Sequence, residues 1–316
     1  MELLGGHMGT LQIEKSVTFQ NILMATDFSK ASQSALKYAA GLAHQYGAKL
    51  HVLNVVPPIA RAVIPLDSLP PDLDRTIAES GLRLKQFVAS NLMEDLEHEE
   101  IVGRGLILQV VDEMIANRRI DLLVVGTHGH SAPAQLLMGS VAEELFRSAS
   151  CPVLTVGPSV DPQKVPGVQR ILFATDFGRA SAQALPYAID LARENHAELI
   201  LLHVVKPAPI AETDPYWHLA DEVLEVQRAQ VALANRRLSS LFPKNANVGC
   251  KVTKMVVCHF LLDSILKTAF EKKADLIVMG VSRASASMAG LKSHIPWTTA
   301  HEVVRNATCP VLTVRA

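Results

Sequence analysis

Glycines near the middle of the chain have the spacing that a phosphate-binding loop needs. The segment Gly126–Gly129 begins and ends with glycine, and Gly139-Ser140 follows after nine further residues. Glycine lets the backbone approach a ligand closely and adopt positive φ, so that N–H groups can surround a phosphate. Ser140 and Glu143 have the spacing of a capping box, which predicts a helix starting at Ser140. The N–H groups at the start of such a helix bind phosphate readily. In the alternative interpretation, the glycines only turn the chain and Ser140 only caps the helix.

The surrounding sequence predicts strands and helices in alternation. The expected strands are Ile22–Ala25, Leu50–Val55, Leu106–Leu108, Leu122–Val125 and Val153–Val156. Helical spacing covers residues 32–46, 73–96 and 110–117. Nearly continuous Val, Leu and Ile strands separated by helices predict a doubly wound, Rossmann-like α/β domain, with a five-stranded, mostly parallel sheet and helices on both faces. Ligands bind such sheets beyond the carboxyl ends of the strands, where the winding reverses. We therefore expect Ala25-Thr26-Asp27 to meet Gly126 there.

The chain contains this domain twice. Three blocks recur in the same order: Ile22–Phe28 as Ile171–Phe177, Asp121–Gly126 as Asp275–Gly280, and Cys151–Val156 as Cys309–Val314. Such repetition predicts two tandem domains, over residues 17–157 and 168–316, joined by a proline-containing linker. Residues 1–16 show no periodic pattern and are left out of the fold prediction.

The composition excludes several classes of protein. Thirty Lys and Arg residues balance 31 Asp and Glu residues, and no dense basic run occurs. Nucleic acid and membrane are therefore not expected as partners. Four cysteines without metal-ligand spacing predict buried thiols in the reducing cytoplasm. The acidic residues between 94 and 100 are expected to form a solvated helical face.

Both copies resemble the universal stress protein family, and the resemblance spans nearly the whole chain. Residues 126–140 match the Gly-x2-Gly-x9-Gly-Ser/Thr pattern of the ATP-binding members of that family. The segment Ala25–Ser29 and the segment Cys151–Val156 are also similar to the family. The resemblance implies that the first copy binds ATP.

The resemblance also implies roles for single residues. Gly129, Gly139 and Ser140 would hold the phosphates, and Val55 would bracket the adenine through its backbone. Asp27 would line the cleft near a Mg²⁺ ion, although capping the following helix is an equal alternative. We expect the two histidines of the loop to be exposed rather than catalytic. The complete set of implied nucleotide-binding residues is Ala25, Asp27, Val55, Gly126, Thr127, His128, Gly129, His130, Gly139, Ser140 and Val141.

The second copy departs from this pattern after its fourth strand. It keeps Ala174, Asp176, Val204 and Gly280, but Arg283 stands where the second glycine would be, and Trp297 and Thr298 replace Gly139 and Ser140. An indole at this position would block a phosphate from the backbone. Thr299 and Glu302 predict a capping box for the helix that follows. The second copy is therefore predicted to be a structural partner that does not bind ATP.

The resemblance further implies that the two copies pair through their last strands, which would form a pseudo-dimer within one chain. Further pairing of whole chains into a homodimer is an open alternative.

No catalytic set accompanies the glycines. The sequence has no Walker-type phosphate loop, no nucleophile elbow and no cationic clamp near the glycines. Together with the resemblance, this absence predicts a stress-response ATP-binding sensor or switch that hydrolyses ATP slowly at most. Two alternatives stay open: an interaction scaffold that needs no nucleotide, and an enzyme that uses a nucleotide.

Overall fold

The computed structural model describes residues 17–58, 73–90, 95–127, 139–161, 167–207, 220–242, 248–282 and 297–316. The elements of the first half are, in chain order, β1 (Asn21–Ala25), α1 (Lys30–Tyr46), β2 (Lys49–Val56), α2 (Leu73–Ala89), β3 (His98–Arg104), α3 (Ile107–Arg118), β4 (Leu122–Gly126), α4 (Ser140–Ser148) and β5 (Val153–Val156). Those of the second half are β6 (Arg170–Ala174), α5 (Arg179–Glu194), β7 (Glu198–Val205), α6 (Ala220–Ser240), β8 (Val252–Cys258), α7 (Leu261–Glu271), β9 (Leu276–Val281), α8 (Trp297–Asn306) and β10 (Val311–Arg315).

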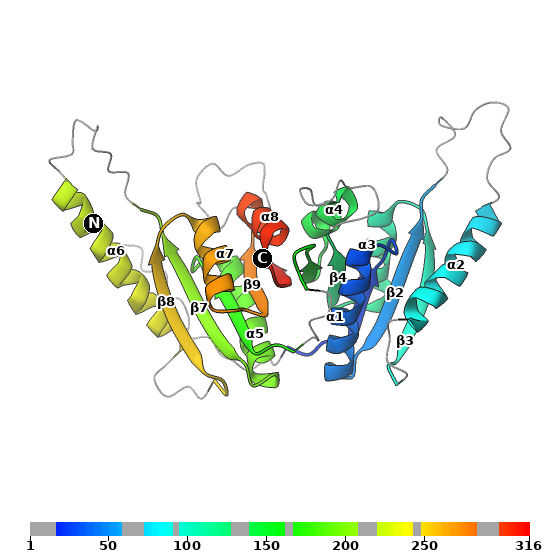
Figure 1. The fold of residues 1–316 in the computed structure, drawn as a ribbon, viewed down its shortest axis with the longest axis horizontal. Helices are drawn as coiled ribbons and strands as arrows, with labels where there is room; N and C mark the ends of the chain where they lie inside the picture. The colour runs from blue at the N-terminus through cyan, green and yellow to red at the C-terminus, as the bar shows by residue number, and fades with distance from the viewer. Residues whose placement is uncertain are drawn as a thin grey trace, which may run out of the picture.

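All ten strands form one continuous sheet. Its order is β3-β2-β1-β4-β5-β10-β9-β6-β7-β8, and the halves lie side by side with α2 and α6 at opposite ends (Figure 1). Neighbouring strands within each half are parallel, for example β1 with β4 and β6 with β9. Among the strands that the structure describes, only the central pair, β5 with β10, is antiparallel. The doubly wound tandem fold and the pairing through the last strands are therefore confirmed.

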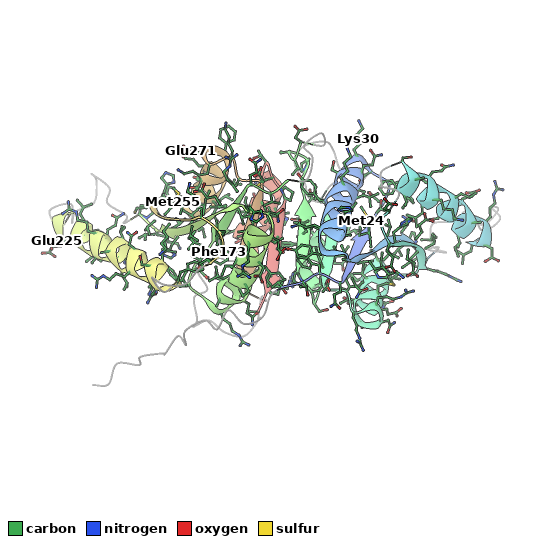
Figure 2. The ribbon with its side chains drawn as sticks, turned by 90° about the horizontal axis from the view of Figure 1, so that it is seen from below. Met24, Lys30, Phe173, Glu225, Met255 and Glu271 are labelled. Atoms are coloured by element: carbon green, nitrogen blue, oxygen red, sulfur yellow. The ribbon has the colours of Figure 1, made fainter. Side chains whose placement is uncertain are left out.

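Helices cover both faces of the sheet. On one face, α1, α2, α5 and α6 pack over a single apolar core that runs through both halves. The other face has two cores, one under α3 and α4 and one under α7 and α8. Successive strand residues alternate between the faces, as when Met24 joins the shared core while Leu23 joins the core under α3. Figure 2 views the molecule from below Figure 1, with α6 and its labelled Glu225 at one end. None of the helices in the described ranges is long and apolar enough to cross a membrane.

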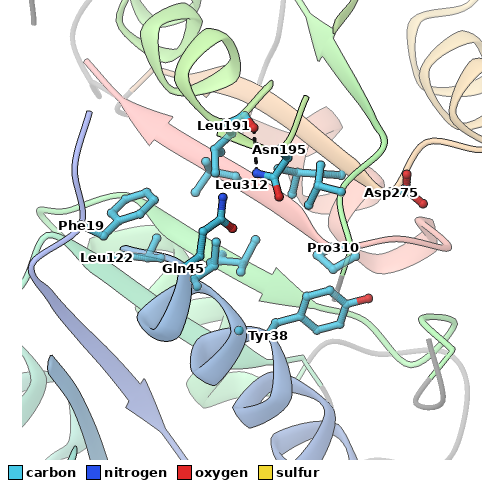
Figure 3. Close-up of a pocket in the computed structure, with 14 residues that line it drawn as sticks. Phe19, Tyr38, Gln45, Leu122, Leu191, Asn195, Asp275, Pro310 and Leu312 are labelled. Atoms are coloured by element: carbon cyan, nitrogen blue, oxygen red, sulfur yellow. Dashed lines mark hydrogen bonds between the residues drawn. The ribbon is translucent and has the colours of Figure 1, made fainter. Parts of the chain in front are cut away.

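The two halves are joined by more than the central ladder. The Thr155 hydroxyl donates to the carbonyl of Val311 at 3.1 Å, and the Thr313 hydroxyl donates to the carbonyl of Val153 at 3.2 Å. Beside this seam, α1 and α5 enclose a small apolar cavity (Figure 3). There, Phe19 and Gln45 of the first half lie opposite Leu191 of the second half. The seam therefore buries apolar surface that each half alone would expose.

The third strand differs from the expectation. It covers His98–Arg104 rather than Leu106–Leu108, and Ile107 already begins α3. As an edge strand, β3 is only partly buried, and its sequence includes Glu99 and Glu100. The apolar signal that marks central strands is therefore weak here. The prediction that these two acidic residues lie on a helical face was wrong.

All four cysteines are free thiols. Cys151 and Cys309 are buried, as predicted, whereas Cys250 and Cys258 are only partly buried, so the prediction was wrong for these two. Burial raises the pKa of the Cys151 thiol to about 12. This thiol therefore stays protonated and poorly reactive at neutral pH.

A buried histidine connects β2 to the exposed edge of the sheet. His51 is 2% exposed, and its Nδ1 lies 3.4 Å from Glu99, which also pairs with Arg118. Burial lowers the pKa of His51, although the charge of Glu99 opposes the shift. The equivalent residue in the second half is Ile200. His51 pairs with Leu23 of β1, and Ile200 pairs with Leu172 of β6 at the same position of the repeat. The site therefore tolerates an aliphatic side chain in this fold.

We expect the substitution His51→Ile to weaken the acid sensitivity of the protein. The unfolded chain takes up a proton on His51 below about pH 6.5, whereas the folded protein resists protonation, so stability falls as the pH drops through this window. The variant should match or exceed the wild type in stability near pH 5.5, and the difference should shrink toward neutral pH. Urea denaturation at several pH values measures this. The exposed His44 provides a control, because His44→Gln should leave the dependence of the unfolding free energy on pH as it is in the wild type. If His51→Ile also leaves this dependence unchanged, burial of His51 does not cause the acid sensitivity.

Candidate functional site

The carboxyl ends of three strands in the first half surround a cleft. β1, β2 and β4 end at its floor, and the first turn of α4 forms one wall. The cleft has a volume of about 1190 Å³ measured out to its open mouth. Its described lining residues are Ala25, Thr26, Asp27, Ser32, Asn54, Val55, Pro57, Pro58, Gly105, Leu106, Ile107, Val125, Gly126, Gly139, Ser140, Val141, Ala142 and Leu145. Seven of the eleven predicted site residues are thus brought together: Ala25, Asp27, Val55, Gly126, Gly139, Ser140 and Val141.

The start of α4 differs from the predicted capping box. Gly139 is the N-cap, and Ser140 is the first helical residue. The Gly139 amide donates to the carbonyl of Thr127 at 2.8 Å, and the Glu143 amide donates to the carbonyl of Gly139 at 2.9 Å. Because the backbone of Thr127 holds Gly139 at the cap, the Ser140 side chain is not needed there. It stays exposed where α4 borders the cleft.

The first turn of α4 offers backbone donors to the cleft. In an α-helix, the amides of the first three helical residues have no acceptor within the helix. In α4 these residues are Ser140, Val141 and Ala142, and all three line the cleft. Such amides, together with the positive end of the helix dipole, favour an anion.

Gly126 has a packing role that the sequence did not reveal. A Cβ atom at this position would lie 2.7 Å from the carbonyl carbon of Ala31 and 2.8 Å from the amide nitrogen of Ser32. The end of β4 therefore approaches the first turn of α1 closely. Gly280 has the same relation to Ala180 in the second half, where the distance is 2.1 Å. This close approach explains why both copies keep the glycine.

Asp27 organises the turn between β1 and α1. Its Oδ1 accepts a hydrogen bond from the Ser29 amide at 3.0 Å and from the Ser32 hydroxyl at 2.6 Å. Ser29, rather than Asp27, is the N-cap of α1. Asp176 makes the equivalent bonds in the second half. The carboxylate therefore has a structural role in both copies, and in the first copy it also lines the cleft.

Four of the predicted residues are not shown at the cleft. Thr127 is fully buried, and its amide donates to the carbonyl of Val156 at 3.0 Å. That amide is used by the sheet, because it extends the pairing of β4 with β5. The segment 128–130, with the other three predicted residues, lies outside the described residues.

Sequence reasoning missed residues that shape the side of the cleft near β2. The Asn54 amide donates to the carbonyl of Thr26 at 2.8 Å, and its Oδ1 accepts from the Ser80 hydroxyl of α2 at 2.5 Å. Leu106 and Ile107 add an apolar wall from the start of α3. Asn54 could have been found in the sequence, because it is a polar residue near the end of the apolar run that forms β2.

The described lining has few groups that could do acid–base chemistry. Asp27 is its only carboxylate, and it contains no lysine, arginine, histidine or cysteine. No cluster of three or more potential metal ligands occurs among the described residues. The cleft can therefore bind a ligand through backbone amides and apolar walls, with a single carboxylate at its floor.

The corresponding helix of the second half begins at Trp297. Thr299 therefore lies inside α8, and the predicted capping box of Thr299 with Glu302 was wrong. The Glu302 carboxylate instead lies 3.4 Å from Arg305 and 3.5 Å from His301, its neighbours on the same helix. A Ser/Thr-x-x-Glu pattern thus failed to mark the N-cap in both halves.

The comparisons with known proteins agree with this architecture. The sequence profile of the Universal stress protein family matches residues 18–157 and 167–315. A universal stress protein of Mycolicibacterium smegmatis is 24% identical over 95% of this chain and 99% of its own length. One of Mycobacterium tuberculosis is 26% identical over 93% of this chain and 96% of its own length. The crystal structure of a universal stress protein from Archaeoglobus fulgidus shares the fold with a TM-score of 0.64 at 22% identity, covering 94% of this chain and 97% of the other. The chain belongs to the universal stress protein family, and it contains two copies of the family domain.

Proposed function

We propose that this protein is a stress-response sensor or switch that binds ATP in its first half. The observation that carries the proposal is the first turn of α4, whose amides border the cleft formed by β1, β2 and β4. In this arrangement the phosphates would lie against Ser140 and Val141, and the loop 126–139 would complete their binding. Val55 would bracket the adenine through its backbone, and Ala25 and Asp27 would line the floor.

Mg²⁺ would enter with the nucleotide rather than bind to the protein alone. Protein-bound Mg²⁺ usually keeps several waters and takes one or two carboxylates together with phosphate oxygens. Asp27 is the one carboxylate that the described lining offers for this purpose. Because the described lining also lacks a cationic side chain to stabilise a leaving phosphate, we expect hydrolysis to be slow at most.

The second half would act as a structural partner that responds to nucleotide binding in the first half. α4 provides the route, because its first turn borders the cleft while Ala142 and Phe146 pack into the core under α7 and α8. The free cysteines favour a reducing cytoplasm as the site of action. Pairing of two such chains into a homodimer is part of the same proposal.

Calorimetric titration of Mg-ATP into the wild type and Gly139→Trp tests the proposal. Gly139 has φ −61° and ψ 142°, so an L-residue fits this backbone without strain. The indole should cover the first turn of α4 and weaken ATP binding at least about tenfold, which corresponds to about 1.4 kcal/mol. We expect one site per chain in the wild type.

Ser148→Trp is the matched control, since Ser148 is exposed at the far end of the same helix. It should bind ATP as the wild type does. Two sites of equal affinity would contradict the assignment of a non-binding second half. If the wild type shows neither heat nor a thermal shift with Mg-ATP, the interaction scaffold becomes the better account.

A further inference from the structure

The second half has its own cleft, and its chemistry differs from that of the first. This cleft has a volume of about 1020 Å³ measured to its mouth. It lies at the ends of β6 and β7 and is bordered by α6. Lys206 and Arg237 belong to its lining, whereas the described lining of the first cleft has no cationic side chain. Its described lining includes no residue from the first turn of α8. The second cleft therefore has two cationic side chains where the first cleft has the amides of a helix start.

The second cleft borders α6 because the second half lacks a hydrogen bond that holds α2 to β2 in the first half. In the first half, Ser80 of α2 links that helix to Asn54 at the end of β2. The equivalent residues in the second half are Ala234 and His203, which lack this hydroxyl-to-amide bond. The Arg237 guanidinium lies 5.7 Å from the centre of the Phe177 ring, against 4.5 Å for Arg83 and Phe28. The space beside α6 is therefore more open than the space beside α2.

Part of the wall of this cleft is aromatic and apolar. The rings of Phe177 and His203 are in contact, with centroids 4.4 Å apart and an interplanar angle of 34°. His203 Nδ1 lies 2.8 Å from the carbonyl of Thr175, so this nitrogen carries a proton and donates it. Val204, Leu233 and Leu261 add apolar surface. A flat apolar body fits these walls better than a hydrated polar group does.

The charges favour a ligand with a single anionic group. Asp176 lies in the lining, but its Oδ1 already accepts bonds from the Gly178 amide and the Ser181 hydroxyl. Lys206 and Arg237 are both exposed, so each would add a modest, salt-sensitive attraction. We infer that the second cleft binds a small aromatic monoanion, whose charged group meets Arg237 and Lys206 and whose ring lies against the Phe177–His203 wall.

Fluorescence titration with anilinonaphthalene sulfonate, an aromatic monoanion, tests this inference on the full chain. We expect one saturable site that Arg237→Gln weakens about two- to fivefold, since the substitution removes one exposed charge but keeps a polar side chain. The neutral analogue N-phenylnaphthylamine should respond little to the same substitution. Ala234→Leu should reduce the binding of both probes, because the larger side chain fills the space beside α6.

Arg83→Gln in the first half is the matched control and should leave the binding of the sulfonate unchanged. Equal loss in Arg83→Gln, or no loss in Arg237→Gln and Ala234→Leu, would overturn the inference. ATP at concentrations that saturate the first cleft should not displace the probe. Displacement by ATP would instead make the second cleft a nucleotide site and refute the inference. If ATP does not bind at all, the proposed function fails while this inference stands on the probe data.

Discussion

Gly280→Ala is expected to destabilise the protein by about 3 kcal/mol or more, at the upper end of the usual cost of overpacking. The new Cβ atom would lie 2.1 Å from the carbonyl carbon of Ala180 and 2.3 Å from the amide nitrogen of Ser181. These are backbone atoms in the first turn of α5, so no side-chain rotation can relieve the clash. Either α5 moves away from the sheet or the end of β9 bends. Both responses open the core that the second half shares with the first.

Chemical denaturation followed by circular dichroism measures this loss, with Gly81→Ala as the control. Gly81 lies within α2, and its only neighbour near the new Cβ atom is the Val102 side chain at 3.9 Å. In a helix this substitution should be neutral or stabilising by up to about 1 kcal/mol. If Gly280→Ala unfolds at the same denaturant concentration as the wild type, the close packing of β9 against α5 is not as described.

Phe146→Ala is expected to cost about 3 to 5 kcal/mol, the usual range for truncating a buried phenylalanine. Phe146 is 1% exposed and belongs to α4 of the first half, yet it packs in the core under α7 and α8. The Arg315 side chain of the second half also donates to the backbone carbonyl of Phe146. The substitution should therefore lower the protection of β9 and β10 from hydrogen exchange, although both strands lie in the other half.

Phe270→Ala separates this effect from the general loss of an aromatic ring. Phe270 is 71% exposed on α7, so its truncation should change stability by less than about 0.5 kcal/mol. Loss of protection confined to the first half in Phe146→Ala would show that the two halves unfold independently. That result would also weaken the proposal that α4 transmits the state of the first cleft.

The sequence alone determined the repeated α/β fold and seven of the residues that line the first cleft. The central strands are nearly continuous runs of apolar residues because both of their faces are buried, so β1, β4 and β5 were predictable almost to the residue. Because parallel strands end at one edge of a sheet, the sequence also placed Asp27 near Gly126. Both inferences rest on local patterns and on general rules of sheet winding.

Features that depend on contacts between distant residues were decided only by the tertiary structure. The edge strand β3 has one partner strand and a polar sequence, so its apolar signal was too weak to locate it. The start of α4 depends on a bond between Gly139 and Thr127, residues twelve positions apart, rather than on the Ser140 capping pattern. Position 126 requires glycine because the backbone of α1 lies against it, and only the packed structure reveals this contact. The cationic cleft beside α6 likewise depends on residues that follow β6, residues at the end of β7 and residues of α6, which are separate in sequence and meet only when the sheet has formed.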